Sequence, residues 1–188
     1  MSTVQILFLI VEFFLVLGVI VYLHANTMSL LRGAPYVGTN SKLIEPILSK
    51  VKLKPGMKFL ELGCGDGRVV CEAVQKYGAI GRGVDVSSLW LWFARMRARK
   101  MGIESKVTFF HQNVWKTDLA WADVIYVYLM PRMLTRYQNH LKQNARAGTQ
   151  IISHSFELER LSDNLTEIAT RGNSRIYYYR VGGKEKGL

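Results

Sequence analysis

The chain has 188 residues, of which 49% are hydrophobic, and a formal net charge of +11. This length accommodates one domain of ordinary size with a short appendage, and the apolar content excludes a largely disordered chain. A surface this basic is either simply solvated or attracts nucleic acid or anionic lipid headgroups, and an apolar segment at the N-terminus favours lipid.

The first segment, residues 4–23, is apolar on all sides and is interrupted only by Gln5, Glu12 and Gly18. A helix of this length spans ~30 Å, which matches the hydrocarbon core of a bilayer. A cleaved signal peptide would carry basic residues before the apolar run, and a buried core helix would show a polar stripe. We therefore expect residues 1–25 to be a transmembrane anchor in which Glu12 is a tolerated single charge.

Basic residues follow this segment and none precedes it. The positive-inside rule therefore places the rest of the chain in the cytoplasm, or in the mitochondrial matrix of a eukaryote, with a single membrane pass. Residues 26–40 contain turn-forming glycine and proline and are expected to be a linker and loop, followed by a folded domain over residues 41–188.

Strand and helix patterns alternate through that domain. Strands are expected over 58–62, 81–85, 106–110, 122–128 and 149–155, and helices over 42–51 (capped by Ser41), 68–77, 88–101 and 132–144. Residues 165–169 and 175–181 flank a turn and are expected to form an antiparallel hairpin. This order predicts an α/β fold with a parallel sheet and a ligand at the carboxyl ends of the strands.

The most informative motif follows the first expected strand, where residues 61–67 read Glu-Leu-Gly-Cys-Gly-Asp-Gly. A strand, a glycine turn and a helix open a nucleotide-binding α/β unit. The dinucleotide fingerprint needs a glycine where this chain has Arg68, and a phosphate-binding loop needs Gly-Lys-Ser/Thr. Glu61 and Asp66 would repel a pyrophosphate but suit a cationic ligand with hydroxyls and an amine. The motif resembles the first motif of class I S-adenosylmethionine-dependent methyltransferases, which implies their seven-stranded sheet with a C-terminal hairpin.

Two polar residues follow the next strands. Asp85 lies 22 positions after Gly63, where a carboxylate can accept both ribose hydroxyls; the competing interpretation is a helix cap. Asn113 stands where methyltransferases commonly place an aspartate that accepts from the adenine amino group, and its amide oxygen can accept as well.

The segment Tyr128-Leu129-Met130-Pro131 follows the fourth expected strand and should face the methyl group. It lacks the Asn-Pro-Pro-Tyr-type motif of amide and nucleobase methylation, and an apolar edge suits an amine, because burial lowers the amine pKa. Cys64, Cys71 and four scattered histidines do not have metal-ligand spacing, so we expect no metal and read the cysteines as packing residues.

Residues 35–39, 61–68, 113–115, 128–131 and 153–157 together resemble the small protein-lysine methyltransferases. That family includes the archaeal broad-specificity enzyme and the mitochondrial lysine methyltransferases of the ATP synthase c-subunit and the adenine nucleotide translocase. The chain departs from it in reading Pro-Tyr-Val-Gly-Thr-Asn for the usual Pro-Tyr-Val-Pro-Thr-Pro, and in Asn113.

The resemblance implies that Tyr36 and Thr39 close over the cofactor and that His154 and Phe156 line the acceptor channel. The acceptor-channel candidates are Tyr36, Leu129, Pro131, His154 and Phe156. The expected S-adenosylmethionine-binding residues are Tyr36, Thr39, Glu61, Gly63, Cys64, Gly65, Asp66, Gly67, Asp85, Val86, Asn113 and Val114.

These expectations describe a membrane-anchored S-adenosylmethionine-dependent protein-lysine N-methyltransferase that acts on a membrane or membrane-adjacent protein. A small-molecule or phospholipid-amine N-methyltransferase and a non-catalytic cofactor-binding scaffold remain open, and no nucleic-acid partner is expected. The aromatic segment 90–93 is expected to pack inside the domain, with lipid contact as the alternative.

Overall fold

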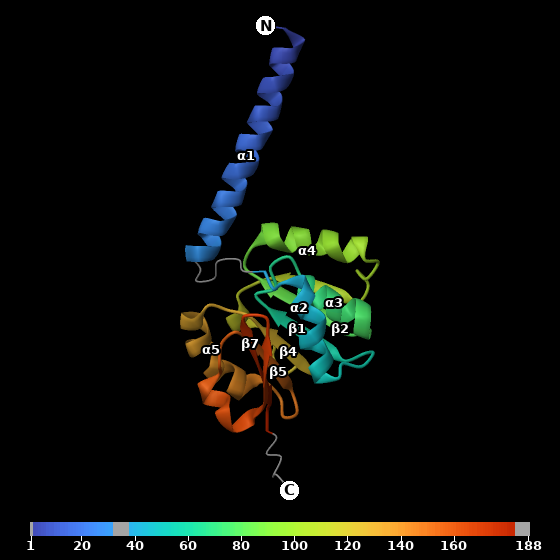
Figure 1. Cartoon of the computed structure of the whole chain (residues 1–188), viewed down its shortest axis with the longest axis vertical. Helices are drawn as coiled ribbons and strands as arrows, with labels where there is room; N and C mark the ends of the chain where they lie inside the picture. Colours follow the sequence, from blue (N-terminus) through green and yellow to red (C-terminus); the bar gives the residue numbers. More distant parts are fainter. Residues whose placement is uncertain (1, 32–37, 183–188) are drawn as a thin grey trace.

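The computed structural model describes residues 2–31 and 38–182, so Tyr36 of the predicted site lies outside the described residues (Figure 1). Helix α1 (Thr3–Leu31) continues past the predicted end of the anchor at residue 25. Its segment Thr3–Leu23 has a mean hydropathy of 2.9 and none of it is buried. By length and composition, α1 is able to cross a membrane.

The domain is built on one sheet of seven strands in the order β3-β2-β1-β4-β5-β7-β6. Strands β1 to β5 pair in parallel, whereas β7 is antiparallel to both β5 and β6. The strands are β1 (Lys58–Leu62), β2 (Ile80–Asp85), β3 (Val107–His111), β4 (Val124–Val127), β5 (Gln150–His154), β6 (Leu165–Arg171) and β7 (Ser174–Arg180). The predicted parallel sheet with a terminal antiparallel hairpin is confirmed.

Helices cover both faces of this sheet, because side chains alternate between the faces along each strand. Phe59 packs in the cluster that contains the buried sides of α2 (Ser41–Leu48), α3 (Arg68–Tyr77) and α4 (Ser88–Lys100). The next residue, Leu60, packs in the cluster under α5 (Pro131–Asn144). The carboxyl ends of the parallel strands therefore meet at one edge between two helical layers.

Some predicted boundaries differ from the structure. The helix predicted over 42–51 ends at Leu48 and continues as a 3₁₀ turn, Ser49–Val51. Its N-cap is Asn40 and not Ser41, because the backbone at Asn40 is extended and its side chain accepts a hydrogen bond from the Lys42 amide. Two further 3₁₀ turns, Val114–Lys116 and Glu159–Asn164, are too short to leave a periodic pattern in the sequence.

Candidate functional site

The glycine turn closes the end of β1 in a conformation that requires glycine. Gly63, Gly65 and Gly67 have φ angles of +69°, +50° and +68°, a region that side chains with a Cβ disfavour. A Cβ at Gly63 would lie 2.8 Å from Leu129 Cδ2, and one at Gly67 would lie 2.8 Å from Phe109 Cε1. The turn therefore brings its backbone closer to its neighbours than any other residue type allows.

Asp85, at the end of β2, is held against this turn. Its Oδ2 accepts a hydrogen bond from the Gly65 amide and its Oδ1 accepts one from the Ser87 amide, both at 2.8 Å. The N-cap of α4 is Ser87, whose hydroxyl accepts from the Trp90 amide. Burial raises the pKa of Asp85, and the amide donors oppose that shift. Each carboxylate oxygen retains acceptor capacity for a further donor at the edge of the sheet.

Two other acidic residues of the motif already have partners. Glu61 is buried, and its Oε2 accepts from the Val70 amide at 2.9 Å. Burial raises the pKa of Glu61 well above its usual value. Asp66 forms ion pairs with Arg68 at 2.9 Å and Arg97 at 2.6 Å. Burial alone would raise the pKa of Asp66, but the two guanidinium groups lower it.

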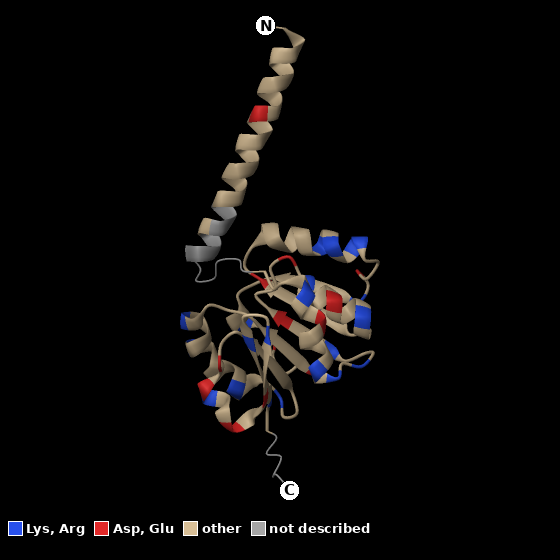
Figure 2. Cartoon of the chain, in the orientation of Figure 1, with Lys and Arg blue, Asp and Glu red and all other residues tan. Residues whose placement is uncertain are grey.

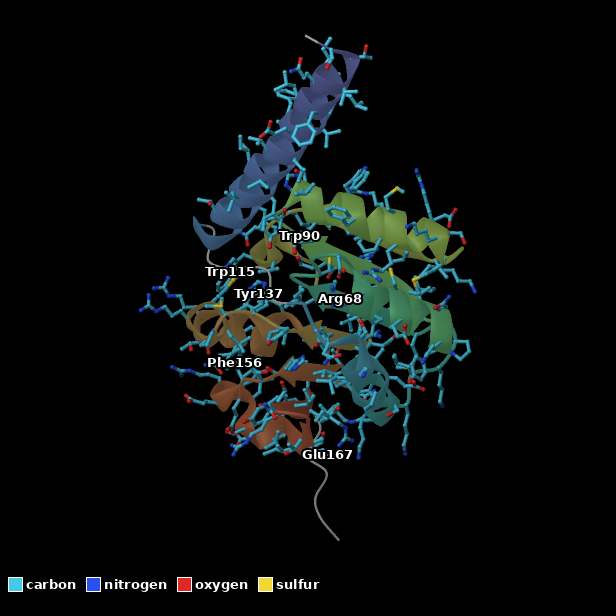
Figure 3. The ribbon with its side chains drawn as sticks, turned by 45° about the horizontal axis from the view of Figure 1, so that its top comes forward. Arg68, Trp90, Trp115, Tyr137, Phe156 and Glu167 are labelled. Carbon is cyan, nitrogen blue, oxygen red and sulfur yellow. The ribbon has the colours of Figure 1, made fainter. Side chains whose placement is uncertain are left out.

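Arg68 also joins the loop before α2 to the glycine turn. Its Nη1 donates to the Thr39 carbonyl at 3.0 Å, and Arg68 is the first residue of α3, where Figure 3 labels it (Figure 3). The Thr39 hydroxyl is 2.8 Å from the Tyr126 hydroxyl, which in turn is 2.6 Å from His154 Nδ1. A buried chain of polar groups therefore runs from the loop through β4 to β5.

His154, at the end of β5, is only 2% exposed. The Tyr128 ring stacks on its imidazole, with 4.2 Å between centroids and 14° between planes. The next residue, Ser155, has a φ of +68°, which is unusual for a residue with a Cβ. The Ser153 hydroxyl donates to the Phe156 carbonyl at 2.6 Å. This tight turn directs Phe156 to the side of the sheet covered by α5, whereas His154 contacts Tyr126 and Tyr128 on the other side.

The burial of His154 leads to a pH prediction. Burial lowers the pKa of His154 to about 4, whereas an unfolded histidine titrates near 6.5. The fold favours the neutral imidazole of His154. The contribution of this residue to the free energy of unfolding is therefore complete above pH 6.5 and is lost as the pH falls towards 4. Between pH 7 and pH 5 we expect a loss of about 2 kcal/mol in the free energy of unfolding.

Urea unfolding at both pH values measures this loss, with His154→Gln as the control. The wild-type protein and the variant share all other titrating groups. The free energy of unfolding of the variant should therefore differ less between pH 7 and pH 5 than that of the wild type. An equal difference in the two proteins would contradict the assignment.

The remaining predicted residues lie around the same edge. Asn113 is exposed and caps the first 3₁₀ turn after β3 by accepting from the Trp115 amide at 3.2 Å. The Val114 carbonyl accepts from the Tyr137 hydroxyl, and the Val86 carbonyl is 2.9 Å from His111 Nε2. Pro131 is the exposed first residue of α5.

Leu129 and Cys64 point into the fold, with exposed fractions of 4% and 3%. Both Cys64 and Cys71 are free and buried, and burial raises the pKa of each thiol, so neither is a reactive nucleophile. No group of His, Cys, Asp and Glu side chains among residues 2–31 and 38–182 is arranged to hold a metal ion.

Sequence reasoning missed Tyr126 and Arg97. Tyr126 lies in a buried strand, where the sequence pattern does not distinguish a tyrosine with a functional hydroxyl from an ordinary aromatic residue of the core. Arg97 lies 31 residues after Asp66 in a helix with several other basic residues, so its sequence position does not indicate this partner. Neither residue carries a local signal, because its role is defined by a partner distant in the sequence.

The donors and acceptors at this edge fit an adenosyl sulfonium cofactor. The two carboxylate oxygens of Asp85 can accept hydrogen bonds from a ribose diol, and the glycine turn lets a ligand approach the backbone closely. Glu61 adds a carboxyl group, and the turn lacks the lysine of a phosphate-binding loop. When bound, such a cofactor supplies an electrophilic methyl group. The chemistry of these residues is thus compatible with S-adenosylmethionine.

Comparison with known proteins also indicates a methyltransferase. Residues 61–164 match the family model described as the ANTKMT methyltransferase domain. The chain is 28% identical over 149 residues to the adenine nucleotide translocase lysine N-methyltransferase of Mus musculus, covering 79% of this chain but only 64% of that enzyme. It is 25% identical over 158 residues to a protein-lysine N-methyltransferase of Saccharolobus islandicus, covering 82% of this chain and 98% of that enzyme.

The fold has a solved counterpart in an RNA methyltransferase from Salinibacter ruber in complex with S-adenosyl-L-homocysteine. The TM-score is 0.74 at 24% identity, covering 81% of this chain and 99% of that one, which supports the fold alone. The family model covers more than half of the 188 residues. The chain therefore belongs to the ANTKMT methyltransferase domain family and is, by family and fold, an S-adenosylmethionine-dependent methyltransferase domain.

Proposed function

We propose that the chain is a membrane-anchored protein-lysine N-methyltransferase whose acceptor is a lysine of a membrane or membrane-adjacent protein. The relatives from Mus musculus and Saccharolobus islandicus are lysine N-methyltransferases by name, which supports the acceptor class. The apolar helix α1 supports the anchor. In this proposal the domain faces the cytoplasm, or the matrix if the protein is mitochondrial.

The cofactor is held, in this proposal, by Asp85 at the ribose, by the glycine-turn amides and Glu61 at the amino-acid end, and by Asn113 at the adenine. Asp66 keeps the turn in place through Arg68 and Arg97 instead of contacting the ligand, because both of its oxygens already accept from guanidinium groups. Thr39, in the loop before α2, covers this site in the proposal.

The observation that carries the acceptor assignment is the stacked pair of Tyr128 and His154 beside the end of β4. A lysine must lose its proton before it can attack a methyl group, and a neutral, apolar lining lowers the pKa of an amine. His154 adds no positive charge near pH 7, since burial lowers its pKa to about 4. Leu129 and Phe156, which pack on the α5 side of the same edge, are the other apolar candidates for the acceptor channel.

The test uses the full chain in vesicles, incubated with radiolabelled S-adenosylmethionine and membranes, followed by separation of protein from lipid. We expect label in methyllysine after acid hydrolysis of the protein fraction. Membranes whose lysines have been blocked by acetylation are the matched control and should yield no labelled methyllysine, because an amide nitrogen is not nucleophilic.

A phospholipid-amine acceptor is the second candidate, favoured by the exposed aromatic residues of α4 next to an anchored site. Label confined to the lipid fraction would replace the lysine proposal with this one. Absence of label from both fractions, together with no calorimetric binding of S-adenosylmethionine, would contradict both and leave a non-catalytic scaffold.

A further inference from the structure

Helix α4 has an outer face that the rest of the domain leaves uncovered. Its inner face is packed through Leu91, Ala94 and Ala98. Trp92 and Phe93 are 54% and 43% exposed and contact each other edge to face at 5.0 Å. The expectation that residues 90–93 pack inside the domain is therefore wrong for these two side chains. Two adjacent exposed aromatic rings are a large apolar surface for water to cover.

The same helix carries only positive charge. Its sequence contains Arg95, Arg97, Arg99 and Lys100 and no acidic residue. Figure 2 shows these basic residues at the C-terminal half of α4, following the uncharged N-terminal half (Figure 2). Arg97 is committed to Asp66, whereas Arg99 and Lys100 are exposed and form no ion pair with the described part of the chain. Exposed aromatic rings and exposed cations are the side chains that a membrane interface with anionic lipids favours.

The short connection from α1 keeps this helix near the membrane. Thr39 is tied to the domain by Arg68 and Tyr126. It follows Leu31, the last residue of α1, by eight positions, which span at most about 28 Å when fully extended. If α1 crosses a bilayer, the edge of the sheet at Thr39 cannot move far from its surface. α4 begins at that same edge, directly after Asp85 and Ser87.

We propose that the outer face of α4 binds the surface of an anionic lipid bilayer and thereby sets the orientation of the methyltransferase domain. We call this face the α4 surface; it consists of Leu89, Trp92, Phe93, Met96, Arg99 and Lys100. The aromatic rings enter the headgroup region, where Trp and other amphipathic rings are favoured, and the two cations bind anionic headgroups. The inference rests on the membrane anchoring proposed above, and it adds a second attachment that α1 does not supply.

A depth probe beside the α4 surface tests the proposal. Ser88 is exposed at the start of α4 and Ile168 is exposed on β6, the strand at the opposite edge of the sheet from β3. Glu167, next to Ile168, lies far from α4 in Figure 3. Ser88→Cys and Ile168→Cys full-length proteins are each labelled with an environment-sensitive fluorophore, since Cys64 and Cys71 are buried. Both are reconstituted in phosphatidylcholine vesicles, with and without phosphatidylglycerol, that contain spin-labelled lipid.

We expect the probe at position 88 to be quenched at least twofold more strongly than the probe at 168, and more strongly with phosphatidylglycerol than without it. Trp92→Ser with Phe93→Ser should abolish the excess quenching, and Arg99→Glu with Lys100→Glu should abolish its dependence on phosphatidylglycerol. Thermal unfolding verifies that these exposed substitutions leave the domain folded. Equal quenching at the two positions would overturn the proposal. Shielding of position 88 in detergent that grows with protein concentration would overturn it in favour of a second copy of the chain.

Carbonate extraction of the same vesicles separates this inference from the anchoring on which it rests. Protein that resists extraction but shows no excess quenching at position 88 contradicts the α4 surface alone. Protein that is released by carbonate contradicts the anchor and, with it, the inference.

Discussion

Asp85→Asn is expected to weaken the binding of S-adenosylmethionine by about 100-fold. The substitution keeps the shape of the side chain but removes its charge and turns one acceptor oxygen into a donor. Two charge-assisted hydrogen bonds to a ribose diol together contribute about 3 kcal/mol, which corresponds to that factor. Titration calorimetry with S-adenosylhomocysteine measures the change directly.

The same substitution should also lower the free energy of unfolding by about 1–2 kcal/mol, because either the Gly65 or the Ser87 amide loses its acceptor. Asp163→Asn, at an exposed site in the last 3₁₀ turn, is the matched control and should change neither quantity. Wild-type affinity in Asp85→Asn would refute the ribose role and leave Asp85 with a structural one.

Tyr126→Phe is expected to reduce methyl transfer by about 10- to 100-fold, because small errors in positioning reacting groups have effects of this size. The substitution removes the hydroxyl between Thr39 and His154, so the loop and the β5 edge lose their connection. It should also lower the free energy of unfolding by about 1–3 kcal/mol, since two buried polar groups are left without a partner. Initial-rate kinetics and urea unfolding measure the two effects.

Tyr178→Phe provides the control for a structural effect. Tyr178 is equally buried, and its hydroxyl donates to the Ile47 carbonyl at 3.2 Å, on the packed side of α2. We expect a loss of stability but little loss of activity in this variant. Equal losses of activity in both variants would mean that Tyr126 acts through stability alone.

The strand, turn and helix around the glycine motif were predictable because their determinants are local. The bounds of β1 and α3 agree with the predicted ranges 58–62 and 68–77. Glycine spacing, an apolar strand and a polar end on β2 operate over a few residues, so they leave a readable pattern. The order of strands and helices then restricts the topology, since parallel strands need right-handed crossovers.

The partners of the site residues were not predictable in this way. Asp66 resembles a ligand-binding acid in the sequence, yet Arg68 and Arg97 occupy its oxygens. The resemblance indicates His154, but its hydroxyl partner Tyr126 lies in β4 and its stacking partner Tyr128 lies directly after that strand. Packing and ion pairs of this kind join residues far apart in the chain, and no periodic pattern encodes them.

The outer face of α4 belongs to the same category. Its composition is visible in the sequence, but a Trp-rich segment on a helix is equally compatible with a buried core. Only the packing of Leu91, Ala94 and Ala98 inward determines that Trp92 and Phe93 face out.

The sequence by itself determined the class of fold, the glycine turn with Asp85 at the end of the next strand, the apolar N-terminal helix and the family. Those features depend on local conformational preferences and on spacing along the chain. Tertiary structure alone decided which acids remain available to a ligand, which hydroxyl joins Thr39 to His154, and which face of α4 is exposed. The physical reason is that desolvation, charge pairing and exposure depend on what surrounds a side chain in space, and those neighbours come from distant segments.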